Sequence, residues 1–123
     1  MNKHASLILR VGLAITFIWI GVLIVKNPAA WASYVLPWAA ALLPVPIETM
    51  MFGTGIFDIL VGLALLVGIK TWIPAFLAAG HIFVVLITTG ITEITVRDIG
   101  LLGASIALLI DTLPASLLKK MRV

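Results

Sequence analysis

Cysteine is absent from this 123-residue chain, and charged residues make up only 11% of it. Without a thiol the chain forms no disulfide, no cysteine-ligated iron–sulfur cluster and no thiolate metal site. Soluble globular domains carry about a quarter charged residues, so the low charge content argues against a soluble enzyme or a nucleic-acid-binding module. The sequence also has no glycine-rich phosphate loop after a strand, no zinc-ligand spacing and no serine nucleophile elbow. We therefore expect neither a metal site nor a nucleic-acid partner.

Hydrophobic residues are abundant instead, at 63% of the chain. The mean hydropathy is +1.26. A soluble monomer of this size has too little interior to bury so much apolar surface. The composition therefore indicates one membrane domain, residues 1–123, for which lipid is the main solvent.

Four apolar segments are long enough to be considered as spans, because a bilayer-crossing helix needs about 20 mostly apolar residues. They are residues 5–25, 50–69, 72–91 and 98–113. The fourth is the shortest, and Pro114 bends or ends it. The sequence predicts an all-α fold, a four-transmembrane-helix bundle.

The connection between the first two spans, residues 28–43, is too apolar for a simple loop. Asn27 followed by Pro28 is typical of a helix start, with a side-chain cap and then proline at the first helical position. Trp and Tyr, which favour the membrane–water interface, recur there at helical spacing, as Trp31, Tyr34 and Trp38. We expect a kinked interfacial helix that serves either as a membrane anchor or as a lid over a site.

The basic residues predict the orientation, because cytoplasmic loops carry an excess of Lys and Arg. With four spans and the N-terminus inside, only Lys26 and Arg97 lie on the outer side. Six basic residues lie on or near the cytoplasmic side, namely Lys3, Arg10, Lys70, Lys119, Lys120 and Arg122. Both termini are therefore expected in the cytoplasm.

Two ionisable side chains stand near the middle of predicted spans. An acid at the bilayer centre costs about 2.5–3.5 kcal/mol, so Asp58 should face the bundle interior. Gly55 and Gly62 flank it at spacings of three and four and allow close helix approach. His81 lies at similar depth on the next, antiparallel span. An Asp–His pair can share a proton, orient the imidazole or bind a quinone carbonyl; each residue is otherwise a structural hydrogen-bonding group.

Charged residues near the ends of the predicted spans suggest further contacts. Arg10 and Asp111 are both expected near the inner boundary, where they would pair, unless Arg10 extends to the headgroups. Arg97 faces either a pocket beneath the interfacial helix or water, and its neighbour Asp98 is expected to cap the fourth helix. Haem is not expected, because His81 has no second axial ligand within the hydrocarbon.

Three stretches carry a family resemblance: residues 9–28, which include Trp19, residues 55–68 with Asp58 before a glycine-containing apolar run, and residues 97–104. They are similar to helices of the DoxX family of small four-helix membrane proteins. The resemblance implies the cytoplasmic (inner) membrane of a prokaryote and an association with thiosulfate:quinone oxidoreductase or other redox and detoxification complexes. Taking the residue patterns and the resemblance together, we expect a ligand or proton site formed from among Asp58, His81, Arg97 and Trp19.

Two functions follow as hypotheses. The first is a membrane subunit or accessory of a quinone-linked redox or detoxification system. The alternative is a small-solute or proton-coupled transporter that works as an oligomer. Either role involves other subunits or further copies of the chain, and the small residues Gly100, Gly103 and Ala104 offer a close-packing face on the fourth helix.

Overall fold

The computed structural model describes residues 1–93 and 95–117. The predicted cytoplasmic residues Lys119, Lys120 and Arg122 lie outside the described residues. Six helices are assigned within the described residues: α1 (Lys3–Lys26), α2 (Pro28–Ala32), α3 (Pro37–Ala41), α4 (Ile47–Val67), α5 (Trp72–Thr89) and α6 (Val96–Thr112). The expectation of an all-α fold holds for every secondary-structure element described.

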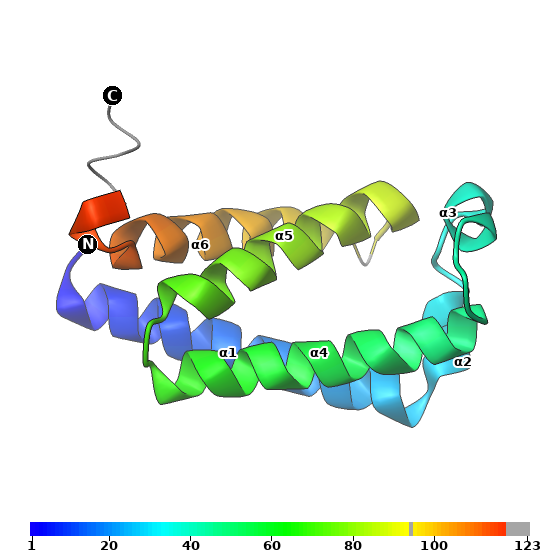
Figure 1. Ribbon diagram of the computed structural model, residues 1–123, viewed down its shortest axis with the longest axis horizontal. Helices are drawn as coiled ribbons and strands as arrows, with labels where there is room; N and C mark the ends of the chain where they lie inside the picture. Colours follow the sequence, from blue (N-terminus) through cyan, green and yellow to red (C-terminus); the bar gives the residue numbers. More distant parts are fainter. Residues whose placement is uncertain (94, 118–123) are drawn as a thin grey trace.

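The four long helices form two layers of two (Figure 1). α1 packs along α4, and α5 packs along α6, while the two pairs touch each other less. One end of the bundle carries the N-terminus and the α4–α5 turn, and we call it the packed end. The other end carries α2 and α3, and we call it the cavity end (Figure 1).

Three helices are long and apolar enough to cross a bilayer, namely α1, α4 and α5. The predicted fourth span corresponds to α6, which has 17 residues. At 1.5 Å per residue it is about 25 Å long, shorter than the ~30 Å hydrocarbon layer. Its length and its charged residues set it apart from the other three, so the described residues contain three candidate spans by composition and length.

The segment predicted as one kinked interfacial helix is divided into two five-residue helices. Asn27 caps α2 as expected, with its side-chain oxygen accepting from the backbone N–H of Ala30 at 3.3 Å. The break comes before Pro37, where Leu36 is extended at φ −65°, ψ 146°. Proline disfavours helical backbone in the residue before it, which explains why the helix stops and restarts.

Glycines set the close spacing of α1 and α4. A Cβ added at Gly62 would lie 2.8 Å from the carbonyl oxygen of Ala14, and one at Gly21 would lie 2.6 Å from the carbonyl oxygen of Gly55. Two helix backbones approach this closely only where one side has no side chain. The α1–α4 pair is therefore tight along most of its length.

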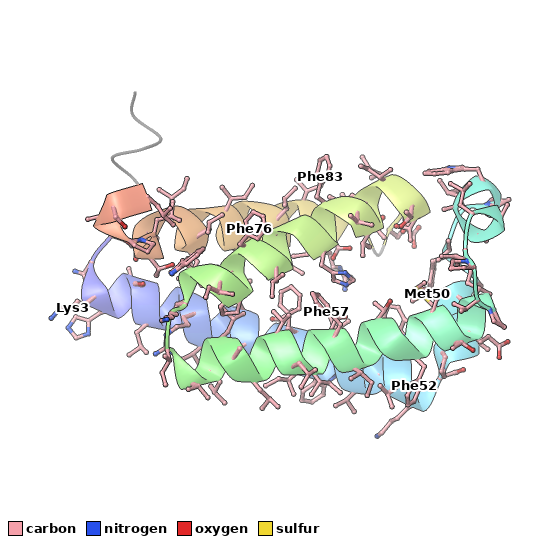
Figure 2. All side chains as sticks on the ribbon, viewed as in Figure 1. Lys3, Met50, Phe52, Phe57, Phe76 and Phe83 are labelled. Carbon is pink, nitrogen blue, oxygen red and sulfur yellow. The ribbon has the colours of Figure 1, made fainter. Side chains whose placement is uncertain are left out.

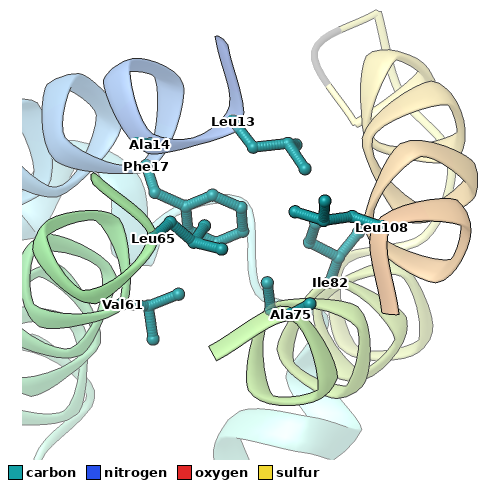
Figure 3. Close-up of a cluster of buried hydrophobic side chains, with 9 residues drawn as sticks. Leu13, Ala14, Phe17, Val61, Leu65, Ala75, Ile82 and Leu108 are labelled. Atoms are coloured by element: carbon teal, nitrogen blue, oxygen red, sulfur yellow. The ribbon is translucent and has the colours of Figure 1, made fainter. Parts of the chain in front are cut away.

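The core between the two layers lies toward the packed end. Figure 3 shows Phe17 and Leu65 facing Leu108 and Ile82 across the gap between the pairs. Leu65 and Leu108 are completely buried. The full cluster comprises Leu13, Ala14, Phe17, Val61, Leu65, Ala75, Ala78, Ile82 and Leu108.

Candidate functional site

Asp58 stands at the middle of α4 and is only 3% exposed. At 3.6 residues per turn, it shares a helix face with Thr54, Val61 and Leu65. Val61 and Leu65 continue this face into the core, whereas Thr54 continues it toward the cavity end. Asp58 therefore lies where the packed core stops.

His81 comes to Asp58 from α5. Its Nε2 lies 3.0 Å from Oδ1 of Asp58. The imidazole also stacks obliquely on Phe57, with ring centroids 5.0 Å apart, and Figure 2 shows Phe57 directed from α4 toward α5. The structure thus brings together the two ionisable residues that the sequence placed at similar depth.

The contact between Asp58 and His81 leaves hydrogen-bonding capacity unused. The distance is that of an ion pair, but Oδ1 has no hydrogen-bond partner among the described residues. Ser105 Oγ is the other buried side-chain oxygen of the described residues in this state, and it does not line the cavity described below. Buried polar atoms normally have a hydrogen-bond partner, so the missing hydrogen bond at Asp58 Oδ1 calls for an explanation.

A cavity of about 860 Å³ extends from this pair toward the cavity end. All four long helices contribute to its wall, and Trp31 and Tyr34 from the α2 region close it on one side. Most lining side chains are apolar. The polar and charged ones are Thr16, Tyr34, Thr54, Asp58, His81, Thr88, Thr89, Thr95, Arg97 and Asp98.

α6 adds two charged residues to the wall, Arg97 and Asp98. Thr95 is the N-cap residue of α6, so the predicted capping role of Asp98 is wrong. Asp98 lies in the first turn, half-buried, and interacts electrostatically with both Asp58 and His81. Sequence reasoning missed this role, although Asp98 shares a helix face with Leu101 and Ser105, which point inward. Arg97 is exposed beside the cavity.

The chemistry of the site depends on how its ionisable side chains are grouped. Within residues 1–93 and 95–117, no three His, Asp or Glu side chains are placed to hold a metal ion. The site offers a carboxylate pair, an imidazole and hydroxyl groups on an apolar wall. Such a surface suits a ligand with a small polar head and an apolar remainder.

Trp19 lies away from this site. It is 67% exposed on the outer face of α1 and does not line the cavity. Its neighbours in a shallow surface pocket are Ile15, Ile18, Val22, Leu23 and Lys26. The structure therefore does not bring Trp19 together with Asp58, His81 and Arg97: its side chain faces the surroundings of the bundle.

Arg10 and Asp111 have separate partners, contrary to the predicted pair. Arg10 Nη1 donates to the carbonyl oxygens of Leu65 at 2.8 Å and Leu66 at 2.9 Å. Asp111 instead accepts from the Met1 ammonium at 2.9 Å. The last carbonyls of α4 have no partner within the helix and attract a cation, which explains where Arg10 goes.

The chain was compared with protein-family models, with curated proteins and with solved structures. The DoxX family model matches residues 5–93, which include α1, α4 and α5 with both Asp58 and His81. Comparison with curated proteins and with solved structures returned no match. The match covers most of the chain and agrees with three apolar helices able to cross a bilayer. This chain is a multi-pass membrane protein that belongs to the DoxX family.

Proposed function

We propose that this protein binds the headgroup of a membrane quinone at Asp58 and His81, as a membrane subunit or accessory of a quinone-linked redox or detoxification system. The observation that carries the proposal is the pair itself: Asp58 Oδ1 is buried 3.0 Å from His81 Nε2 without a hydrogen bond among the described residues, and both side chains line the cavity. A buried carboxylate oxygen that accepts no hydrogen bond is costly. A ligand hydroxyl donating to the Asp58 carboxylate would offset that cost.

The chemistry of the pair suits both redox forms of a quinone. Quinone carbonyls accept hydrogen bonds, and a protonated His81 can donate one from its second ring nitrogen, Nδ1. Quinol hydroxyls donate, and the Asp58 carboxylate accepts. The cavity volume of about 860 Å³ falls within the range of roughly 300–1,000 Å³ for small-molecule sites.

The proposed orientation in the membrane has four crossings and both termini in the cytoplasm. α6 runs beside α5, and its Leu108 is fully buried against the other helices, which supports a fourth crossing. With both termini in the cytoplasm, the packed end faces the cytoplasm. The cavity end with α2 and α3 then lies at the outer surface of the membrane, where Trp31, Tyr34 and Trp38 suit the interface.

The proposed function requires a partner subunit that carries out the electron transfer. Reducing a quinone to a quinol takes two electrons and two protons. The two electrons come from a redox subunit of the proposed system, and any thiol or iron–sulfur centre belongs to that subunit because this chain has no cysteine. The role of this chain is to hold the headgroup and to provide an acid and a base beside it.

One observation favours the alternative function, a proton-coupled transporter of a small solute. Asp58 and Asp98 both line the cavity and interact electrostatically, as suits a site that takes up a proton or a cation. The closed core at the packed end would then have to open during transport. Solute or proton flux into proteoliposomes that contain only this protein, without quinone, would favour this alternative.

Quinone binding to the purified protein tests the proposal directly. Titration with a short-tailed benzoquinone should quench the fluorescence of Trp31, which lines the cavity. We expect Asp58→Asn and His81→Gln to weaken binding at least tenfold, about 1.4 kcal/mol. Glu48→Gln removes an exposed carboxylate from the same helix and should leave the affinity unchanged. A wild-type protein that binds no quinone, or an Asp58→Asn variant that binds equally well, would contradict the proposal.

A further inference from the structure

Residues of the cavity wall on α1 and α6 are exposed at the outer surface of the bundle. On the α1 side the wall is formed by Thr16, Ile20 and Leu23, and Leu23 is 41% exposed. On the α6 side it includes Gly100, which is exposed and has no atom within 4 Å of where a Cβ would stand. Leu23 and Gly100 thus border both the cavity and the outer surface of the bundle.

This opening follows from how α1 and α6 are arranged. At the packed end they meet, because Leu13 and Leu108 share the core and Asp111 binds the Met1 ammonium. Toward the cavity end the flank of α1 lines the cavity instead. The α1–α6 contacts named here lie at the packed end, and the space beside Gly100 is open.

The opposite flank, between α4 and α5, differs at the level of the Asp58–His81 pair. Phe57 projects into it and stacks on His81 (Figure 2). Farther along, Val84 lines the cavity and is 53% exposed. An aromatic ring therefore stands beside the pair on this flank, whereas the α1–α6 flank has a residue without a side chain.

We propose that the ligand is a membrane-dissolved amphiphile whose apolar tail leaves the cavity between α1 and α6, over Gly100. This inference rests on the proposed quinone site and specifies a quinone with a long isoprenoid tail. The headgroup lies at Asp58 and His81, and the tail passes Ile20 and Leu23 into the lipid. A water-soluble quinone without a tail would use the same headgroup site and leave this opening empty.

A side chain at Gly100 tests the tail path without disturbing the fold. Gly100→Leu adds atoms where nothing stands within 4 Å, and leucine favours the helix more than glycine does. Gly103→Leu is the matched control, because Gly103 lies on the same helix in equally open space but does not line the cavity. Both variants should unfold no more readily than the wild type.

Binding is measured with two quinones of the same headgroup, one with a long isoprenoid tail and one with a methyl group in its place. We expect Gly100→Leu to weaken the long-tailed quinone at least tenfold and the tailless one less than twofold, and Gly103→Leu to change neither. Equal weakening of both probes would overturn the tail path, since Gly100 would then border the headgroup. Unchanged binding of both, with Val84→Trp weakening only the long-tailed probe, would overturn it in favour of the α4–α5 flank. Failure of the wild type to bind either probe would instead reject the quinone site itself.

Discussion

The two ends of this bundle are built from the same four helices but differ in how their interior is filled. At the packed end, side chains from both helix pairs meet around the fully buried Leu65 and Leu108. At the cavity end the same pairs enclose about 860 Å³ of space. Since α1 and α4 stay close along their length, the difference arises between the pairs and not within them.

Polar groups follow the same division. At the packed end Arg10 donates to two backbone carbonyls at the end of α4. At the boundary of the cavity Asp58 Oδ1 is buried 3.0 Å from His81 Nε2 without a hydrogen bond among the described residues. Buried polar atoms without a hydrogen bond are rare, and each needs an explanation. Under the function proposed above, the packed end supplies stability and the cavity end holds the ligand.

The largest expected loss of stability comes from separating α1 and α4. Gly62→Leu places side-chain atoms where even a Cβ would lie 2.8 Å from the carbonyl oxygen of Ala14. Overpacking of this kind costs typically 1–3 kcal/mol, and a clash with backbone costs about 3 kcal/mol or more. Unfolding in mild detergent, followed by tryptophan fluorescence during addition of sodium dodecyl sulfate, measures the change.

The control for that prediction lies on the same helix. Gly53 is exposed, and a Cβ added there has no atom within 4 Å. Gly53→Leu should therefore be as stable as the wild type or slightly more so, because leucine favours the helix. If the two variants lost stability equally, the close α1–α4 approach at Gly62 would have no energetic importance.

A smaller effect is expected from making a second cavity at the packed end. Leu65→Ala removes a fully buried side chain, and such truncations cost 2–5 kcal/mol in soluble proteins. In a bilayer the unfolded helices remain in an apolar solvent, so only lost packing counts and we expect about 2 kcal/mol. The free energy of unfolding, measured as above, gives the value.

Met51→Ala makes the matched change at the cavity end. Met51 lies on the same face of α4, two heptads from Leu65, and lines the cavity. Because this truncation only enlarges an existing space, we expect a cost below about 1 kcal/mol. Equal costs at the two positions would mean that the cavity end is as tightly packed as the core.

The three long apolar helices and the depth of the central pair could be predicted from the sequence. Apolar runs of about 20 residues mark α1, α4 and α5, and charged or turn residues mark their ends. Asp58 and His81 each stand about ten residues from the turn at Lys70, and the structure has them 3.0 Å apart. Antiparallel neighbours joined by a short turn have a fixed register, so counting residues was sufficient.

The cavity, the partner of Arg10 and the division of the interfacial segment could not be predicted from the sequence, because each depends on how separate segments pack together. The cavity lies between the two helix pairs. The order of apolar and polar residues along any one helix does not reveal how far apart the two pairs lie. The partner of Arg10 is a pair of backbone carbonyls, which every helix has and no side chain marks. The sequence predicted a kink within residues 28–43, but the division into two short helices depends on the backbone geometry around Leu36.

Among the variants that disturb the packed end, the smallest effect on stability is expected at Arg10. Its guanidinium donates to the carbonyl oxygens of Leu65 and Leu66, and it also fills the space beside Gly68, where a Cβ would lie 2.6 Å from Nη1. Arg10→Met keeps the apolar stem and removes the donors, so the last carbonyls of α4 lose a cation. Because the side chain is partly exposed and water can replace it, we expect a cost of about 1 kcal/mol.

Lys3→Met, on the exposed first turn of α1, is the control and should change nothing measurable. The affinity for quinone should stay within twofold of the wild type in both variants, because Arg10 lies at the packed end and does not line the cavity. A large loss of quinone binding in Arg10→Met, at nearly unchanged stability, would show that the two ends are coupled and that stability and function are not divided between them.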